Sequence, residues 1–272
     1  MNGTASQATW LSRGVKGIGA ASFLADVGHE IPTALPPSLL TSTLGAPAAA
    51  LGAIEGVSDA LAGAARFGGG VLADDPARRR KVAVGGYATT AVLGAATAGA
   101  TAVWQVGVLR AAAWTARGLR VPARNALLAD IVPPRAYGRA YGFERMMDNL
   151  GAVFGPLLAL GLVAWLGVTW AIGLSAVPGL LAAAAIVYAI RRTPRPTRRD
   201  AVAALAPKPV CGSAFGVLAT VQSLGNLAAG AVAGVLWTAV SPTAAFAYLT
   251  AWMLLALAGL FFLRTSVRAE TL

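Results

Sequence analysis

Residues 82–101 read VAVGGYATTAVLGAATAGAT, a stretch without a charged side chain that directly follows the basic run Arg78-Arg79-Arg80-Lys81. A helix that crosses a bilayer needs roughly 20 mostly apolar residues. Inside a bilayer the backbone must also satisfy its own hydrogen bonds, so an apolar run of this length predicts a helix. Similar runs occur at 18–42, 47–71, 103–120, 139–164, 169–190, 213–238 and 243–263. The sequence therefore predicts an all-α membrane protein with about eight transmembrane helices.

The overall composition agrees with this interpretation. Of the 272 residues, 57% are hydrophobic and 12% are charged, which is about half the charged fraction of an average soluble domain. The formal net charge is +11, a value that would suggest nucleic-acid binding in a soluble protein. Here the basic residues have another explanation, the orientation of membrane helices. We therefore expect a lipid bilayer as the surroundings and no nucleic-acid partner.

Basic residues gather in alternate loops between the predicted helices. The groups are Arg13 and Lys16; Arg78, Arg79, Arg80 and Lys81; Arg117, Arg120, Arg124, Arg135, Arg139 and Arg145; Arg191, Arg192, Arg195, Arg198, Arg199 and Lys208; and Arg264 and Arg268. The intervening loops, near 42–47, 101–103, 165–169 and 239–243, contain no charge. Because Lys and Arg favour cytoplasmic loops, we expect a multi-pass protein of the bacterial inner (plasma) membrane with both termini cytoplasmic.

Two stretches of the sequence are similar to one another at an offset of 74 residues. Residues 137–142, YGRAYG, align with residues 211–216, CGSAFG, and Leu150-Gly151 aligns with Leu224-Gly225. The last two predicted helices thus look like a copy of the fifth and sixth. Such a repeat is typical of transporters built from two parallel halves. The alternative is chance similarity between membrane helices that are rich in glycine and alanine.

Several motifs resemble those of the major facilitator superfamily of transporters. Residues 70–80, GVLADDPARRR, are similar to the family's loop signature of glycine, leucine, an acidic residue and a basic cluster. Asp75 stands where the family usually has a basic residue, and Ala77 stands where it has glycine. Arg110 matches the arginine of another family motif, although Trp114 replaces the glycine expected soon after it.

A further motif lies in the fifth predicted helix. Gly151-Ala-Val-Phe-Gly155-Pro156 resembles the Gly-xxx-Gly-Pro sequence that is found mostly in antiporters of the family. Ala159 and Leu160 replace the trailing glycine pair of that motif. Glycines four residues apart also allow two helices to approach closely, so Gly151 and Gly155 are candidates for helix packing.

The resemblance covers about 15–191 as the family's N-terminal six-helix domain and 212–264 as its last two helices. The family's seventh to tenth helices have no counterpart between these segments. The resemblance therefore implies an MFS-like six-helix domain at 1–191, a cytoplasmic Pro/Arg-rich linker at 192–211 and a two-helix segment at 212–272.

Ionisable side chains inside membrane helices are expensive, and are therefore candidates for a proton or substrate pathway. The set is Asp26, His29, Glu30, Glu55, Asp59, Arg110, Glu144 and Asp148. Most of them follow one another at intervals of three or four residues, which places them on shared helix faces. We expect the acids to converge on a central cavity and to pair with Arg110 and Arg66.

Proton coupling needs an ionisable side chain whose protonation changes when it moves from water into a dehydrated environment of low dielectric constant. Asp26, Glu30 and Asp59 are the best candidates for this role, and His29 could relay protons. The alternative is that several of these groups are paired structural ions or lie in wet helix ends. His29 could equally act as an interhelical hydrogen-bond donor.

The loop between the second and third predicted helices resembles a cytoplasmic gate of the family. By this resemblance, Asp74, Arg78, Arg79 and Arg80 contact the start of the helix near Gly212. A carboxylate is favoured at a helix N-terminus because that end carries free N–H groups. The alternative is that the arginines only fix topology and bind anionic lipid.

The sequence contains no recognisable metal cluster, phosphate-binding loop or activated nucleophile, so we expect no metal, no cofactor and no enzymatic activity. The resemblance implies a secondary active transporter, with proton-coupled export of a small organic molecule of unspecified identity. A homodimer could then supply the helices that have no counterpart. The alternative is an internally truncated, non-transporting membrane protein with a structural or interaction role.

Overall fold

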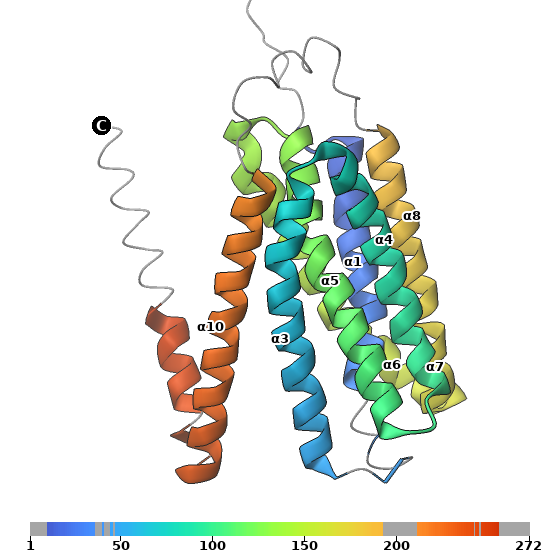
Figure 1. Ribbon diagram of the computed structural model, residues 1–272, viewed down its shortest axis with the longest axis vertical. Coiled ribbons are helices and arrows are strands. Elements are labelled where there is room, and N and C mark those ends of the chain that lie inside the picture. Colours follow the sequence, from blue (N-terminus) through green and yellow to red (C-terminus); the bar gives the residue numbers. More distant parts are fainter. Residues whose placement is uncertain are drawn as a thin grey trace, which may run out of the picture. The chain divides into compact units, whose positions relative to one another are not determined.

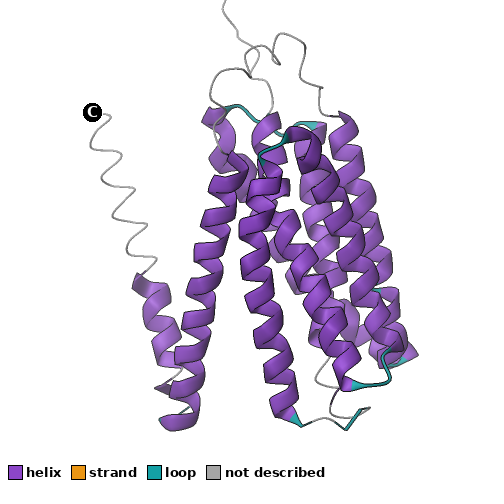
Figure 2. Ribbon diagram, viewed as in Figure 1, coloured by secondary structure: helices purple, strands orange, loops and turns teal. Residues whose placement is uncertain are grey.

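A computed structural model describes residues 10–35, 40, 44–45, 47–192, 211–241, 243–244 and 246–255 of the chain. Regular structure in these residues is entirely helical, which confirms the predicted all-α class (Figures 1 and 2). The α-helices are α1 (Arg13–Ala34), α3 (Ala48–Ala73), α4 (Pro76–Ala96), α5 (Val103–Ile131), α6 (Tyr137–Leu166), α7 (Val168–Leu174), α8 (Ala176–Arg192) and α10 (Cys211–Ala239). A shorter apolar helix covers Phe246–Leu255.

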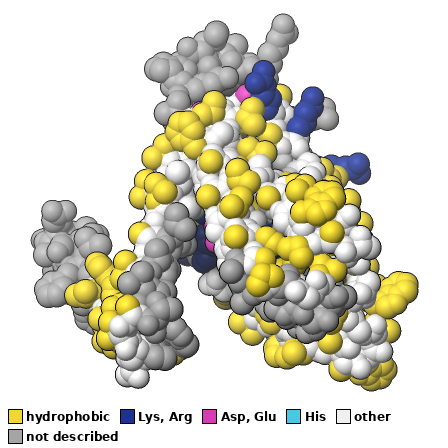
Figure 3. All heavy atoms as spheres, turned by 60° about the horizontal axis from the view of Figure 1, so that its bottom comes forward, with side chains coloured by type: hydrophobic (Ala, Val, Ile, Leu, Met, Phe, Trp, Pro, Cys, Tyr) yellow, Lys and Arg dark blue, Asp and Glu magenta, His cyan; other side chains and the backbone are white. Residues whose placement is uncertain are grey.

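The described helices have the length and surface of membrane helices. The segments Pro76–Gly99, Tyr137–Leu166 and Val168–Arg192 are long and apolar enough to cross a bilayer. Helices α1, α3 and α5 contain the charged side chains of the central site. Large apolar side chains such as Leu160, which is 68% exposed, cover the outer faces (Figure 3). The chain is therefore a membrane protein.

The first six long segments pack into a helical bundle. Helix α1 packs most extensively against α6 and α8, and α5 packs against α3 and α4. Helices α4 and α8 also contact one another. Very small residues permit these contacts: a Cβ atom added at Gly28 of α1 would lie 2.8 Å from the Gly179 nitrogen of α8. The helices of the bundle therefore pack with their backbones close together, as is common for membrane helices.

Gly151 and Gly155 of α6 lie directly against α1. A Cβ atom at Gly155 would lie 2.5 Å from Glu30 Cβ, and one at Gly151 would collide with the Phe23 carbonyl oxygen. Pro156 is accommodated inside the same helix. By contrast, a Cβ atom at Gly52 or Gly56 would meet nothing within 4 Å among the described residues. Gly-xxx-Gly spacing therefore marks a helix contact in α6 but not in the described surroundings of α3.

Several helix boundaries differ from the sequence prediction. Helix α5 continues to Ile131, well beyond the predicted end at residue 120, and accommodates Pro122. It can do so because its basic side chains are buried inside the bundle instead of forming a loop. The segment predicted at 169–190 is divided into α7 and α8 at Ser175. The sequence also predicts that Pro32, Pro36 and Pro37 kink the first helix; Pro32 lies within α1, and residues 36–37 lie outside the described residues.

The chain divides into two compact units, Met1–Thr220 and Val221–Leu272. The first unit contains the bundle and the beginning of α10, and the second contains the rest of α10 and the helix Phe246–Leu255. The two residues that the internal repeat aligns, Tyr137 and Cys211, lie on α6 and α10 respectively, and α10 is described from Cys211 onward.

The contact between α6 and α1 can be tested by adding one methyl group. Gly155→Ala should lower the free energy of unfolding by about 1–3 kcal/mol, because the new Cβ overpacks the interface. Gly161→Ala is the matched control, since a Cβ there meets nothing within 4 Å, and alanine is the better helix former. The measurement is the thermal unfolding midpoint in mild detergent, and equal midpoints for the two variants would contradict the packing described here.

Candidate functional site: a charged network around α5

Three arginines on α5, spaced seven residues apart, each pair with an acid from a different helix. Arg110 Nη2 lies 2.7 Å from Glu55 Oε2 of α3. Arg117 Nη2 lies 3.0 Å from Asp26 Oδ1 of α1, and Arg124 Nη1 lies 2.8 Å from Glu144 Oε1 of α6. Helix α5 is thus tied by ion pairs to three neighbours. The expected pairing of acids with Arg110 is found for one of them, Glu55.

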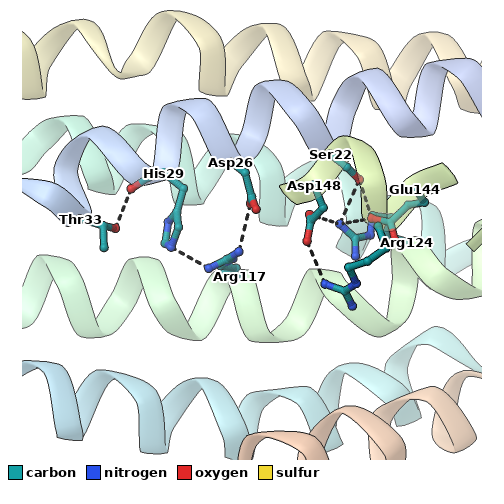
Figure 4. Close-up of polar contacts among 9 residues, drawn as sticks. Ser22, Asp26, His29, Thr33, Arg117, Arg124, Glu144 and Asp148 are labelled. Carbon is teal, nitrogen blue, oxygen red and sulfur yellow. Dashed lines mark hydrogen bonds and ion pairs between the residues drawn. The ribbon is translucent and has the colours of Figure 1, made fainter. Parts of the chain in front are cut away.

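Arg117 is shared between two ionisable groups of α1 (Figure 4). It holds Asp26 with Nη2 and lies 2.8 Å from His29 Nε2 with Nη1. Because arginine has donors only, His29 Nε2 must accept this hydrogen bond, which places the imidazole proton on Nδ1. The rings of His29 and Trp114 are in contact, with centroids 4.0 Å apart and ring planes inclined by 32°. Both Asp26 and His29 are buried.

The two acids of α3 face α5 through different partners. Glu55 pairs with Arg110, whereas Asp59 accepts a hydrogen bond of 2.7 Å from Trp114 Nε1. The Arg110 guanidinium also lies over the Trp114 ring, 4.3 Å from its centroid. Trp114, the residue that departs from the family motif, therefore connects α3 with the buried arginine and with His29. Asp59 itself is exposed in the described structure.

A second cluster of charges joins α5 to α6 at one end of this row of arginines (Figure 4). Arg124 Nη1 contacts Glu144 and also donates to Asp148 Oδ1 at 3.2 Å and to Ser22 Oγ at 3.0 Å. The Ser22 hydroxyl in turn donates to Glu144 Oε1 at 2.8 Å. Arg145 holds the second oxygen of Asp148 at 2.9 Å. Glu144 and Asp148 are thus both paired with arginine side chains.

Two expected participants stand apart from these pairs. Glu30 is half-buried on α1, and it forms no ion pair with any residue that the structure describes. The expected pairing of Arg66 with a carboxylate is not found among the residues that the structure describes. Its Nη1 instead approaches the Ala219 carbonyl oxygen at 3.5 Å.

The sequence interpretation missed several members of the network. Arg117, Arg120 and Arg124 were assigned to a cytoplasmic loop cluster, but they lie on α5 inside the bundle. For Arg117 and Arg124 the available signal was their spacing of seven residues from Arg110 and from each other, since this spacing repeats on one helix face; Arg120 does not follow it. Ser22 and Trp114 gave no comparable signal, because their roles depend on neighbours from other helices.

The expected gate loop lies at the start of α10. Ser213 N donates to Asp74 Oδ1 at 3.0 Å, and the Ser213 hydroxyl donates to Asp74 Oδ2. Gly70 packs against this helix, since a Cβ there would lie 2.8 Å from Gly216 Cα. Asp74 therefore accepts one backbone N–H of α10, that of Ser213, in the way that an N-cap side chain does. We name this contact between residues 70–74 and 212–216 the α10 latch.

The three arginines that follow Asp74 differ in their surroundings. Arg79 is buried, and its Nη1 donates to both oxygens of Asp130, at 2.7 and 2.6 Å. Arg78 is exposed and lies 3.4 Å from Asp75. Arg80 is half-buried and forms no ion pair within the described part of the chain. Arg79 is thus the basic residue that fixes the loop to α5.

Comparisons with known proteins agree with this arrangement of helices and charges. A family model described as Major Facilitator Superfamily matches residues 18–211. The chain therefore belongs to the Major Facilitator Superfamily.

Individual relatives are similar over part of their length. An uncharacterised protein of Mycobacterium bovis is 33% identical over 180 residues, which are 65% of this chain and 44% of the relative. An uncharacterised MFS-type transporter of Methanocaldococcus jannaschii is 26% identical over 190 residues, 69% of this chain and 47% of the relative. A multi-drug resistance efflux pump homologue of Lactococcus lactis subsp. cremoris is 32% identical over 62 residues, 23% of this chain and 52% of the relative. The chain spans about half the length of the curated relatives it matches.

The contribution of the buried Arg124 to stability can be separated from that of the exposed Arg145. Arg124→Gln should lower the free energy of unfolding by about 3–5 kcal/mol, because it leaves buried carboxylates unpaired. Arg145→Gln removes another partner of Asp148, but the Arg145 side chain is 54% exposed, so its loss should cost about 1 kcal/mol or less. Unfolding in detergent measures both values, and equal losses would argue against a buried ion cluster.

The α10 latch can be tested through Cys211, the single cysteine of the chain. Asp74→Ala removes the acceptor for the Ser213 donors, so the start of α10 should open more often. Maleimide labelling of Cys211 should then be several-fold faster than in the unmodified chain. Arg78→Ala, in the same loop but exposed, is the control and should leave the rate unchanged. An unchanged rate in Asp74→Ala would show that the carboxylate does not hold the helix.

Proposed function

We propose that the chain acts in secondary active transport and couples proton movement to export of a small organic molecule. The observation that carries this proposal is Arg117, whose guanidinium is shared between Asp26 and His29 in the middle of the bundle. A proton taken up by Asp26 removes the charge that holds one side of Arg117. The arginine is then free to change partners, which is what a proton-driven conformational step needs.

The carboxylates of Glu30 and Asp59 support the same proposal. Neither forms an ion pair in the described part of the chain, so each can gain or lose a proton without breaking a salt bridge. Asp59 is also exposed on α3 in the described structure, so a substrate or a proton can reach it. In transporters of this kind, substrate and ion sites lie near the bilayer midplane between helix bundles.

The α10 latch supports a gating role on the cytoplasmic side. The positive-inside rule orients this end of the bundle, together with both termini, towards the cytoplasm of a bacterial inner membrane. Opening of the latch would release α10 from α3 during the transport cycle. A second copy of the chain, forming a homodimer, would supply a matching bundle around the central charges.

The chemical class of the substrate is proposed from a relative. One relative carries the name of a multi-drug resistance efflux pump, so hydrophobic organic cations are reasonable test compounds for this chain. The exposed carboxylate of Asp59 and the half-buried carboxylate of Glu30 favour a cationic over an anionic compound. The alternative function is a non-transporting membrane protein with an interaction role, and the same assay distinguishes the two.

The test uses the purified chain in proteoliposomes, with ethidium as the transported compound and an imposed pH gradient. Asp26→Asn and Asp59→Asn should abolish the part of ethidium movement that depends on the gradient, because the amides cannot take up a proton. Asp75→Asn is the control: Asp75 caps α4, and asparagine caps equally well. Ethidium fluorescence inside the vesicles measures the rate.

Two outcomes would count against the proposal. Gradient-driven movement that both variants retain at the rate of the unmodified chain would remove Asp26 and Asp59 from the coupling step. A folded, vesicle-inserted chain that moves no test compound in either gradient direction would favour the non-transporting alternative.

A further inference from the structure

A small buried cavity lies among α1, α4, α5 and α8, beside the central network. Its volume is about 20 Å³, which accommodates about one water-sized particle. The polar side chains that line it are His29, Tyr87, Thr90, Thr97, Arg110 and Arg120, with Trp114 between them. The lining includes two guanidinium groups and no carboxylate. Because Arg110 is paired with Glu55, Arg120 is the lining guanidinium that has no carboxylate partner among the described residues.

Three unpartnered polar atoms belong to residues that line this cavity. They are Arg110 Nε, Arg120 Nε and the Tyr87 hydroxyl, each buried and without a hydrogen-bond partner among the described residues. The fourth such atom in the described part of the chain, Arg66 Nε, lies elsewhere. Buried donors are almost always satisfied in native proteins. Their gathering around one cavity indicates that a bound particle accepts hydrogen bonds there.

Arg120 differs from the other three arginines of α5 because no carboxylate pairs with it in the described structure. Its residue exposure is 3%, and its guanidinium carbon lies 4.1 Å from the centroid of the Tyr87 ring. Stacking on an aromatic ring stabilises a cation only in part. A buried guanidinium remains charged, and a buried charge without a counterion is strongly unfavourable. Arg120 therefore needs a negative partner, and the cavity is the space beside it.

The chemistry of the lining selects the class of ligand. Thr90 and Thr97 already donate to carbonyl oxygens of their own helix, so the free groups are the arginine and tyrosine donors. A water molecule would accept hydrogen bonds but would leave the charge of Arg120 uncompensated. A phosphate or an organic carboxylate is too large for a cavity of about 20 Å³.

We propose that this cavity binds a single chloride ion, held by Arg120 with Arg110 and the Tyr87 hydroxyl. The ion compensates the buried charge of α5 and links α5 to α4 across the cavity. Because His29 and Trp114 also line the site, its occupancy acts on the side chains that contact Arg117 and Asp59. The site is distinct from the proposed proton carriers and does not depend on the chain being a transporter.

The test is direct binding of radioactive chloride to the full chain in mild detergent, with sodium gluconate keeping the ionic strength constant. We expect saturable binding of about one chloride per chain, competed by bromide, together with a higher thermal unfolding midpoint in chloride than in gluconate. Arg120→Gln should weaken chloride binding about tenfold or more, because a charged donor is lost. Arg145→Gln, an exposed arginine outside the cavity, is the control and should bind chloride as the unmodified chain does.

Tyr87→Phe is a second variant that removes one hydroxyl and keeps the ring under Arg120. It should weaken binding several-fold, and it decides the question if Arg120→Gln does not fold. The proposal is overturned by a folded chain that shows no saturable chloride binding, in which case the cavity holds water. It is overturned equally by folded Arg120→Gln or Tyr87→Phe variants that bind chloride as tightly as the Arg145→Gln control.

Discussion

The structure depends on the need to compensate arginines that are buried on a single membrane helix. Helix α5 carries four arginines, of which Arg110, Arg120 and Arg124 are buried and Arg117 is half-buried, and three of the four are matched by acids from α1, α3 and α6. Each ion pair fixes the position of a neighbouring helix along the α5 axis, because a contact of 2.7–3.0 Å is lost when the helices slide past one another. Apolar packing through glycine and alanine brings the helices close, but it specifies register less strictly.

Helix α3 links the centre of the bundle to one of its ends. Glu55 joins it to Arg110 in the centre, and Gly70, at its other end, packs against the start of α10. These two residues are about 22 Å apart along a rigid helix with a rise of 1.5 Å per residue. A change in the pairing of Arg110 that moves α3 must therefore also disturb its contact with α10.

The sequence was sufficient for the helical class, the order of the helices and the family. Long uncharged runs such as residues 82–101 have one physical explanation in a bilayer, and the structure confirms it. The end of α5 was not predictable in the same way, because a basic cluster at residues 117–124 is also typical of a cytoplasmic loop. Only tertiary partners, above all Glu144, show that Arg124 is inside the bundle. The Asp59–Trp114 contact likewise joins two helices whose sequences do not reveal their rotation.

The arginines of α5 also constrain how the protein can be assembled in a membrane. An arginine at the centre of an isolated helix opposes insertion by about 3 kcal/mol, so α5 is a poor membrane helix alone. When it emerges during synthesis, Asp26 and Glu55 are already present on α1 and α3. The acid that compensates Arg124 lies on α6, which is made later. Stable insertion of α5 therefore requires α6, and the two helices must enter the bilayer as a pair.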